Sequence, residues 1–139
     1  MPSIISGNLY QALRFFNTKT FLPESVGMKA LCLVRDDVVV ASTIYEGFNG
    51  KNVWVHLAAD ESKRWMTKSY LHYCFHYPFN EMGVDRLSGY VNSDNYDAIR
   101  LNEHLGYKRE AILKGASPTG LDVIIYVMWR QDCRFLRKG

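Results

Sequence analysis

The sequence is poor in cysteine and has no cysteine or histidine spacing that is typical of a metal site. Its 139 residues contain three cysteines, which are Cys32, Cys74 and Cys133. They lie far apart and form no CxxC pair, so neither a zinc motif nor a redox-active pair is indicated. An odd, unpatterned number of cysteines is typical of reduced thiols in the cytoplasm. We therefore expect a cytoplasmic protein without a disulfide framework or a metal centre.

Long apolar segments are missing as well. No uninterrupted apolar stretch approaches the ~20 residues that a helix needs to cross a bilayer. Residues 1–7 carry neither the basic segment nor the apolar run of a signal peptide. We therefore expect neither membrane insertion nor export.

The sequence also lacks a strong charge of either sign. Its formal net charge is +3, and the densest basic cluster is the C-terminal set of Arg130, Arg134, Arg137 and Lys138. A dedicated nucleic-acid binder usually has a concentrated basic stripe, so this mildly basic balance suits an anionic small ligand equally well. The hydrophobic content of 47% is high enough to form a core. We expect one domain over residues 1–139.

The first half of the chain predicts a short helix followed by an antiparallel meander. The expected elements are a helix over 8–16, a loop over 18–27, and strands over 30–34, 38–45 and 53–58. Asn49-Gly50, between the last two strands, is a residue pair that a type I′ hairpin turn favours.

The second half predicts two helices and further strands. Polar residues recur at every fourth position from Lys68 to Asn80, which is typical of a helix over 67–79 with one polar face. Pro78 and Gly83 are expected to end this helix. The other expected elements are a strand over 86–91, a helix over 95–105 with Ser93 and Asp94 as caps and Gly106 as its stop, and strands over 107–114 and 121–129. The predicted order is α-βββ-α-β-α-ββ.

Three short motifs in this second half carry a family resemblance. They are Gly83-Val-Asp-Arg-Leu87, Asn95-x-x-Ala98-x-x-Leu101 and Leu105-Gly106-Tyr107. Together they resemble the second half of the GNAT family of acetyl-CoA-dependent N-acetyltransferases, and the resemblance extends over residues 50–136. Tyr77-Pro78-Phe79 and Cys133-Arg134-Phe135-Leu136 are similar to a GNAT subgroup that is often found in phages and prophages.

This resemblance implies a fold and a co-substrate. The fold class is α/β (α+β), a single GNAT-like domain with a mostly antiparallel sheet of roughly six to seven strands, splayed middle strands and about three to four flanking helices. The implied co-substrate is acetyl-CoA, held between the strands over 53–58 and 86–91. Its pantetheine arm pairs with strand backbone as an added strand does, and its diphosphate lies on the amides that open the next helix.

Glycine is missing from the loop that would hold this diphosphate. The family pattern has glycines that let backbone amides approach phosphate, but this chain has no glycine over 51–82. Residues with a Cβ disfavour positive φ, so the side chains of Lys63, Arg64 and Lys68 would have to bind the phosphates. The alternative is an ordinary solvated basic turn. Trp65 is expected to pack beneath this loop or against the cofactor.

The resemblance thus implies a set of cofactor-contacting residues on the third strand, on the loop after it and on the last helix. They are Leu57, Ala58, Ala59, Lys63, Arg64, Trp65, Met66, Thr67, Lys68, Asn95 and Asn102. Asn95 has a second interpretation as a helix cap. A backbone N–H of Leu57 or Ala58 is the expected donor to the thioester oxygen.

Acetyl transfer to an amine needs a base, because an amine of pKa ~10.4 is protonated at pH 7. In the third strand, side-chain alternation puts His56 on the face opposite Val55 and Leu57. An imidazole has an ordinary pKa of about 6.5, so His56 is the predicted base. The alternative is a packed or hydrogen-bonded histidine without a chemical role. Glu46 and Glu110 are weaker candidates.

The leaving thiolate needs a hydrogen bond or a proton. Many GNAT enzymes protonate it with a tyrosine one residue after the helix leucine, and in this sequence that position is Asn102. An amide can donate a hydrogen bond but cannot supply a proton at physiological pH. Tyr126 on the last strand is the alternative acid. The predicted catalytic set is therefore His56, Asn102 and Tyr126.

Three functions remain open from the sequence. The first is an acetyl-CoA-dependent N-acetyltransferase for a small-molecule or protein amine whose identity the residues do not specify, with a homodimer as a further expectation. The second is a non-catalytic phage structural or host-interaction protein that retains a degenerate GNAT fold, which the missing glycines and the missing tyrosine favour. The third is a nucleic-acid-modifying acyltransferase. A phage-encoded protein would lie in the host cytoplasm.

His72 and His76 lie four residues apart, a spacing that can hold a metal on one face of a helix. They belong to the polar stripe of the predicted helix, and no third ligand accompanies them. We therefore expect exposed histidines and no metal.

Overall fold

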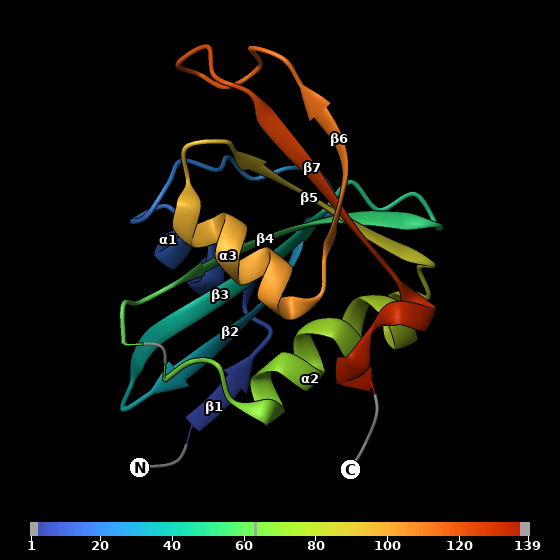
Figure 1. Ribbon diagram of the computed structural model, residues 1–139. Helices are drawn as coiled ribbons and strands as arrows, with labels where there is room; N and C mark the ends of the chain where they lie inside the picture. The colour runs from blue at the N-terminus through green and yellow to red at the C-terminus, as the bar shows by residue number, and fades with distance from the viewer. Residues whose placement is uncertain (1–2, 63, 137–139) are drawn as a thin grey trace.

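A seven-stranded sheet forms the centre of the computed structural model, which describes residues 3–62 and 64–136 (Figure 1). Its strands are β1 (Ser3–Ser6), β2 (Lys29–Arg35), β3 (Val38–Glu46), β4 (Asn52–Ala59), β5 (Arg86–Asn92), β6 (Lys108–Leu113) and β7 (Val123–Trp129). They lie in the order β1-β2-β3-β4-β5-β7-β6, and neighbouring strands are antiparallel except for the parallel pair of β4 and β5. The predicted mostly antiparallel α+β sheet is confirmed.

Three α-helices of the described chain cover the two faces of this sheet. They are α1 (Leu9–Phe16), α2 (Lys68–His76) and α3 (Tyr96–Leu105). α1 packs on one face, whereas α2 and α3 pack on the opposite face, which is in front in Figure 1. A π-helical turn (Tyr77–Met82) continues α2, and two short 3₁₀ turns (Arg130–Asp132 and Arg134–Leu136) follow β7. No helix among the described residues is both long and apolar enough to cross a membrane.

The alternation predicted for β4 is confirmed, and it divides the core into two parts. Val53, Val55 and Leu57 belong to the larger apolar cluster, between the sheet and helices α2 and α3. Ala58 belongs to the smaller cluster beneath α1, and His56 faces the same side. The β4 backbone therefore separates the two apolar clusters.

α3 begins and ends at residues with a clear capping geometry. The Asn95 side chain accepts a hydrogen bond from the Ala98 amide at 3.2 Å and is the N-cap. The prediction that Ser93 and Asp94 cap this helix is wrong, because residues 92–95 form a turn, closed by a 2.9 Å hydrogen bond from the Asn95 amide, before the helix begins. Gly106, at a φ of 106°, ends α3 as predicted.

The tightest turn of the meander differs from the predicted one. Asp36 and Asp37, between β2 and β3, have φ angles of 53° and 63°, and a type I′ turn needs positive φ at both central residues. Asn49 instead accepts hydrogen bonds through its side chain from two backbone amides that follow it. The predicted type I′ turn at Asn49-Gly50 is therefore wrong, since only Gly50 of that pair has a positive φ.

Two further boundaries also differ from the prediction. β1 is an edge strand of four residues paired with β2, which is too short for alternation to reveal it in the sequence. Pro78 does not end the second helix, because the chain continues through the π-helical turn and stops at Gly83, at a φ of 79°. Proline is tolerated at the start of a helical turn because its missing N–H is not needed there.

The parallel pair of β4 and β5 opens soon after it begins. The two strands pair only at Asn52–Arg86, Val53–Leu87 and Trp54–Ser88 within the described sheet. Both strands continue beyond this point, and each stays paired with its outer neighbour, β3 or β7. The predicted splay of the middle strands is confirmed. Since β4 leads into α2 and β5 into α3, both helices border the gap.

Candidate functional site

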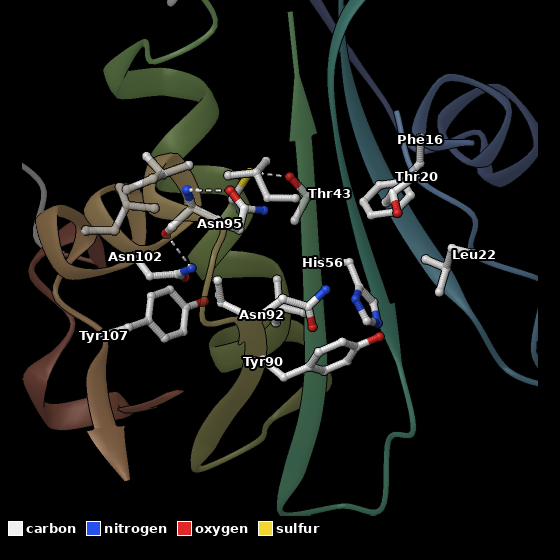
Figure 2. A pocket seen from close by; sticks show the side chains of 18 of the residues that line it. Phe16, Thr20, Leu22, Thr43, His56, Tyr90, Asn92, Asn95, Asn102 and Tyr107 are labelled. Carbon is white, nitrogen blue, oxygen red and sulfur yellow. Dashed lines mark hydrogen bonds between the residues drawn. The ribbon is translucent and has the colours of Figure 1, made fainter. Parts of the chain in front are cut away.

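A cavity of about 230 Å³ lies where β4 and β5 diverge. Its walls come from both strands, from α2 and α3, and from the connection between α1 and β2. Figure 2 shows Phe16, Thr20 and Leu22 at one end, Asn95, Asn102 and Tyr107 at the other, and His56 with Tyr90 between them. The cavity therefore joins the α1 face of the sheet to the face that α2 and α3 cover.

The structure brings some of the predicted site residues together at this cavity and places others elsewhere. Those that line the cavity are His56, Leu57, Trp65, Asn95 and Asn102. Those that do not line it are Ala58, Ala59, Arg64, Met66, Thr67, Lys68 and Tyr126. Lys63 lies outside the described residues. Two of the predicted residues on β4, His56 and Leu57, thus meet Asn95 and Asn102, together with Trp65 alone from the loop.

The β4 backbone offers unpaired groups to the cavity. Along an antiparallel pair, successive residues turn their N–H and C=O groups alternately toward the partner strand and away from it. The Asp60 amide donates a hydrogen bond to the Val40 carbonyl on β3 at 2.8 Å. The backbone N–H and C=O of Ala58 therefore also point toward β3, whereas those of Leu57 point toward β5. The Val55 carbonyl oxygen lies 3.7 Å from the place that a Cβ on Gly89 would take, which agrees with this alternation. Of the two predicted oxyanion donors, the geometry favours the Leu57 N–H.

His56 is held by a carboxylate that is itself held by a serine. The Nε2 atom of His56 lies 2.5 Å from Oε2 of Glu46 on β3. The Ser25 hydroxyl donates a hydrogen bond to Oε1 of Glu46 at 2.9 Å. The imidazole lies near the rings of Phe16 and Tyr90, at centroid distances of 6.1 and 5.5 Å. These contacts fix the ring, and no protein partner for its Nδ1 is found among the described residues.

Burial lowers the pKa of His56 below its ordinary value, although the Glu46 carboxylate opposes this shift. The imidazole is therefore neutral at pH 7. Because a carboxylate only accepts hydrogen bonds, the neutral ring carries its proton on Nε2 and its lone pair on Nδ1. Burial and the nearby Glu46 raise the pKa of Tyr90, so its hydroxyl stays protonated beside the ring. His56 is thus in the protonation state that a general base needs.

α3 and the residue after its C-cap line the opposite end of the cavity. Asn102 donates a hydrogen bond from Nδ2 to the Ala98 carbonyl at 2.9 Å, and because an amide nitrogen has two protons, one remains for a ligand. The Tyr107 hydroxyl points into the cavity (Figure 2), and no hydrogen-bond partner for it is found in the described part of the chain. Burial raises the pKa of Tyr107 well above its ordinary value, so this hydroxyl remains a neutral donor.

Tyr126 and Glu110 lie away from the cavity and have structural partners. The Tyr126 hydroxyl donates to Oε2 of Glu103 at 2.8 Å, and Arg109 binds the same oxygen at 2.7 Å. Burial and this carboxylate raise the pKa of Tyr126. Glu110 accepts two hydrogen bonds from Arg86, at 3.1 and 2.9 Å. The Tyr126 side chain therefore links β7 to α3, and neither Tyr126 nor Glu110 lines the cavity.

The loop between β4 and α2 uses several of its own amides. The Asp60 carboxylate accepts from the Ser62 amide at 3.1 Å, and the Ser62 hydroxyl accepts from the Arg64 amide at 3.3 Å. Thr67 is the N-cap of α2, because its hydroxyl accepts from the Tyr70 amide at 3.1 Å. The amides of Ser62, Arg64 and Tyr70 therefore already have partners within the chain, and in the described part of the loop they are not open to a phosphate.

Basic side chains surround the same loop. Arg64 and Lys68 are exposed on either side of the α2 N-cap. Trp65 is buried beneath the loop within the larger core, as the first interpretation predicted, and it also lines the cavity. Its contact with a cofactor stays a prediction. The loop therefore favours binding of an anion by side chains rather than by a row of amides.

A buried thiol also reaches the cavity wall. Cys74 on α2 lies 3.2 Å from the Thr43 hydroxyl, which in turn lies 2.8 Å from the Tyr70 hydroxyl. Burial raises the pKa of Cys74 to about 12, so the thiol is protonated at neutral pH. Since the thiolate is the nucleophilic form of cysteine, a route through an acylated cysteine is disfavoured.

His72 and His76 are structural contacts of α2. Their rings stack at a centroid distance of 5.3 Å. Nδ1 of His72 lies 2.9 Å from the Phe135 carbonyl oxygen, and Nδ1 of His76 lies 3.0 Å from Asn80 Nδ2. Both side chains are half-buried, so the expectation that they are exposed is wrong. Over residues 3–62 and 64–136, no three metal-ligating side chains gather in one place.

Solved structures with similar folds are acetyltransferases. A point mutant of the spermidine N-acetyltransferase SpeG from Vibrio cholerae has a TM-score of 0.79 at 11% sequence identity, over 97% of this chain and 96% of that chain. A dodecameric form of the Vibrio cholerae enzyme in an intermediate state has a TM-score of 0.77 at 11% identity, over 93% and 94%. A GNAT-family acetyltransferase from Bacillus anthracis has a TM-score of 0.62 at 16% identity, over 73% and 66%.

This chain therefore has the GNAT fold that its sequence motifs implied. No protein-family model and no curated protein matches the sequence. At these identities the likeness concerns the fold, so any chemistry has to be argued from the residues of this chain.

Three residues of the site escape prediction from the sequence: Ser25, Tyr90 and Tyr107. Ser25 lies in a loop, and no residue pattern places it next to Glu46, which is 21 positions away. Alternation along β5 puts Tyr90 on one face, but its contact with His56 follows only once β4 and β5 are known to be neighbours. Tyr107 belongs to the motif that stops α3, and the motif defines its residue type without showing where its hydroxyl points.

Proposed function

We propose that this protein is an acetyl-CoA-dependent N-acetyltransferase that transfers an acetyl group to an amine. The observation that carries the proposal is the open edge of β4 in a cavity that has a neutral base, His56, on one side and the donors Asn102 and Tyr107 on the other. Acetyl-CoA supplies an acetyl group activated as a thioester. The GNAT fold shared with enzymes named as N-acetyltransferases supports the same reaction class.

The cavity walls fit a thioester arm. Val55 and Leu57 turn unpaired backbone groups toward the gap, so an extended pantetheine chain can pair with β4 as an additional strand. The opposite wall is apolar and includes Val91, Ala98, Leu101 and Leu105. The Leu57 N–H is the proposed donor to the thioester oxygen as negative charge develops there, and loss of one such donor typically costs ~2.7–4 kcal/mol.

The diphosphate end depends on side chains. Arg64 and Lys68 lie at the start of α2, where the helix dipole also favours an anion by about 0.3–1 kcal/mol when exposed. Thr67 satisfies only one of the amides that the first helical turn leaves unpaired. We expect moderate affinity, because the loop lacks the glycines that would let more of its backbone approach phosphate.

His56 takes the proton from the attacking amine. Deprotonating an amine of pKa ~10.4 at pH 7 costs about 4–5 kcal/mol, at 1.36 kcal/mol per pKa unit. Nδ1 of His56 accepts this proton, and Glu46 stabilises the resulting imidazolium. The nitrogen lone pair forms the bond to the acetyl carbon, the carbon–sulfur bond breaks, and sulfur leaves with its electron pair. His56 then returns its proton to solvent.

Tyr107 and Asn102 stabilise the leaving thiolate by hydrogen bonds. The raised pKa of Tyr107 makes its proton hard to remove, so donation of a hydrogen bond is favoured over full proton transfer. Tyr107 thereby takes part of the role that the family resemblance assigns to a tyrosine at the position of Asn102.

Gly89 offers a direct test, because it borders the gap and its φ lies outside the left-handed region. A Cβ there would make ordinary contact with the Val55 carbonyl oxygen, at 3.7 Å, so Gly89→Ala is a control that still folds and binds. Gly89→Val fills the gap with two further methyl groups. By isothermal titration we expect micromolar acetyl-CoA binding for the wild type and Gly89→Ala, and at least ~10-fold weaker binding for Gly89→Val.

Thermal unfolding of both variants shows whether a loss of binding reflects a blocked gap or a lost fold.

The second candidate function, a non-catalytic protein with the same fold, is favoured by the glycine-free loop. Absence of wild-type binding at millimolar acetyl-CoA would overturn the proposed enzyme and support that second candidate.

A further inference from the structure

We infer that the acceptor is a monoamine whose single amino group is carried on an apolar or aromatic group, and not a polyamine. This inference rests on the proposed function and concerns the end of the same cavity that opens on the α1 face of the sheet. It follows from the size and the apolar character of that end, and from the absence of a carboxylate among the described residues that line it.

The acceptor end is lined by aromatic and aliphatic side chains. Phe16 and Leu22 are buried, whereas Phe21 and Tyr90 are largely exposed, and all four line the cavity. Figure 2 shows Phe16 and Leu22 on the side of His56 that faces away from Asn102. An ammonium group is attracted to aromatic faces, and an apolar group of the same molecule is favoured by the aliphatic wall. The volume of about 230 Å³, which the thioester arm also needs, favours a small group on the acceptor.

The charges around this end match one ammonium group. Among the described residues that line the cavity there is no Asp, Glu, Lys or Arg. Glu46 does not line the cavity itself. One of its carboxylate oxygens contacts His56, and the other accepts a hydrogen bond from Ser25. Glu24, in the connection between α1 and β2, lines a separate depression beside Arg14. Lys19, on the same connection, places its ammonium 5.7 Å from the Phe15 ring and adds positive charge.

A second ammonium group on the acceptor would stay charged without a partner. The first one loses its proton to His56 and enters the reaction as a neutral amine. A second one, farther along a polyamine, would lie against the apolar side chains at the mouth of the cavity, where no described lining residue offers a carboxylate partner. The cavity therefore selects against acceptors with more than one positive charge.

An aromatic monoamine and a polyamine can be compared directly as acceptors. We expect kcat/KM for 2-phenylethylamine to exceed that for spermidine by at least ~30-fold at pH 8 and low ionic strength. Equal or better acetylation of spermidine would overturn the inference, and so would acetylation of neither amine by a protein that binds acetyl-CoA. Titration with acetyl-CoA separates a failure of this inference from a failure of the proposed function, because absence of acetyl-CoA binding contradicts the proposed function itself.

Thr20 provides a matched pair of variants. It is exposed and lines the acceptor end, so Thr20→Glu and Thr20→Gln introduce side chains of the same shape that differ in charge. We expect Thr20→Glu to raise kcat/KM for spermidine by about 10-fold over Thr20→Gln by supplying the missing counter-charge. The ratio for 2-phenylethylamine is expected to change much less. An equal response of both amines would contradict the charge argument.

Discussion

Nε2 of His56 lies 2.5 Å from Oε2 of Glu46, and the two residues belong to neighbouring strands whose register fixes their separation. Glu46 is the last residue of β3 and pairs with Trp54, two positions before His56 on β4. Diagonal neighbours of this kind share a face of an antiparallel pair. Because paired strands hold their register rigidly, the carboxylate orients the imidazole without help from a ligand. The proposed base is therefore built into the sheet rather than into a loop.

We predict that His56→Ala removes the acidic limb of the pH–rate profile. In the wild type, kcat/KM rises as His56 loses its proton and levels off above the His56 pKa, which burial holds below the ordinary value of about 6.5. At neutral pH, loss of the base is expected to lower kcat/KM ~10²–10⁴-fold. Initial rates over pH 4.5–8, with acetyl-CoA affinity measured separately by titration, test this.

Glu46→Gln is the companion variant in that experiment. It keeps the shape of the side chain but removes the charge that raises the His56 pKa, so the acidic limb is expected to move to lower pH. A limb that persists unchanged in His56→Ala would show that another group titrates.

The same histidine predicts a pH dependence of stability. Its pKa is lower in the folded than in the unfolded chain, so between these two pKa values the unfolded chain binds more protons. The free energy of unfolding is therefore expected to decrease as the pH falls below about 6.5 toward the folded pKa. Urea unfolding at pH 7.5, 6.5 and 5.5 measures the slope, and His56→Gln is expected to make it shallower. An identical slope in both proteins would argue against a buried, neutral His56.

A pair of tyrosine variants tests the thiolate end. Tyr107→Phe removes the free hydroxyl from the cavity, so kcat is expected to fall about 10-fold, as for the loss of one hydrogen bond to a charged group. KM for acetyl-CoA is expected to change little, because the bond is made as the thiolate leaves. Steady-state kinetics with acetyl-CoA as the varied substrate separate the two parameters.

Tyr126→Phe is the matched control. Its hydroxyl bonds to Glu103 away from the cavity, so kcat is expected to stay unchanged while the free energy of unfolding falls by ~1 kcal/mol. A loss of kcat in Tyr126→Phe that equals the loss in Tyr107→Phe would mean that the distinction between the two hydroxyls is wrong.

Much of the fold could be predicted, because local patterns report local structure well. The alternation in β4 correctly separated Leu57 from His56, and Gly106 correctly marked the end of α3. The failures are also local in origin. Asn49-Gly50 has the residue types of a type I′ turn, yet Asp36 and Asp37 adopt that geometry because only two residues connect β2 to β3 there.

The candidate site could be predicted only in part. His56, Leu57 and Asn102 were identified from chemistry and from the family resemblance, and they do line one cavity. Tyr126 was selected as a tyrosine on the last strand, but strand membership does not say which way a hydroxyl points or what it binds. Their proposed chemical roles stay predictions, and the variants described above test those of His56 and Tyr107.

The sequence by itself determined the order of the helices and strands after β1, the faces of β4 and the kind of residues available for proton transfer, since these depend on neighbours along the chain. Only the tertiary structure decided that Ser25, Glu46 and His56 form one hydrogen-bonded line and that Tyr107 faces the cavity. The contact of Glu46 with His56 follows from the register of β3 and β4, whereas the cavity exists because β4 and β5 pair for three positions and then part. That divergence depends on how the whole sheet twists and packs, which no local pattern encodes.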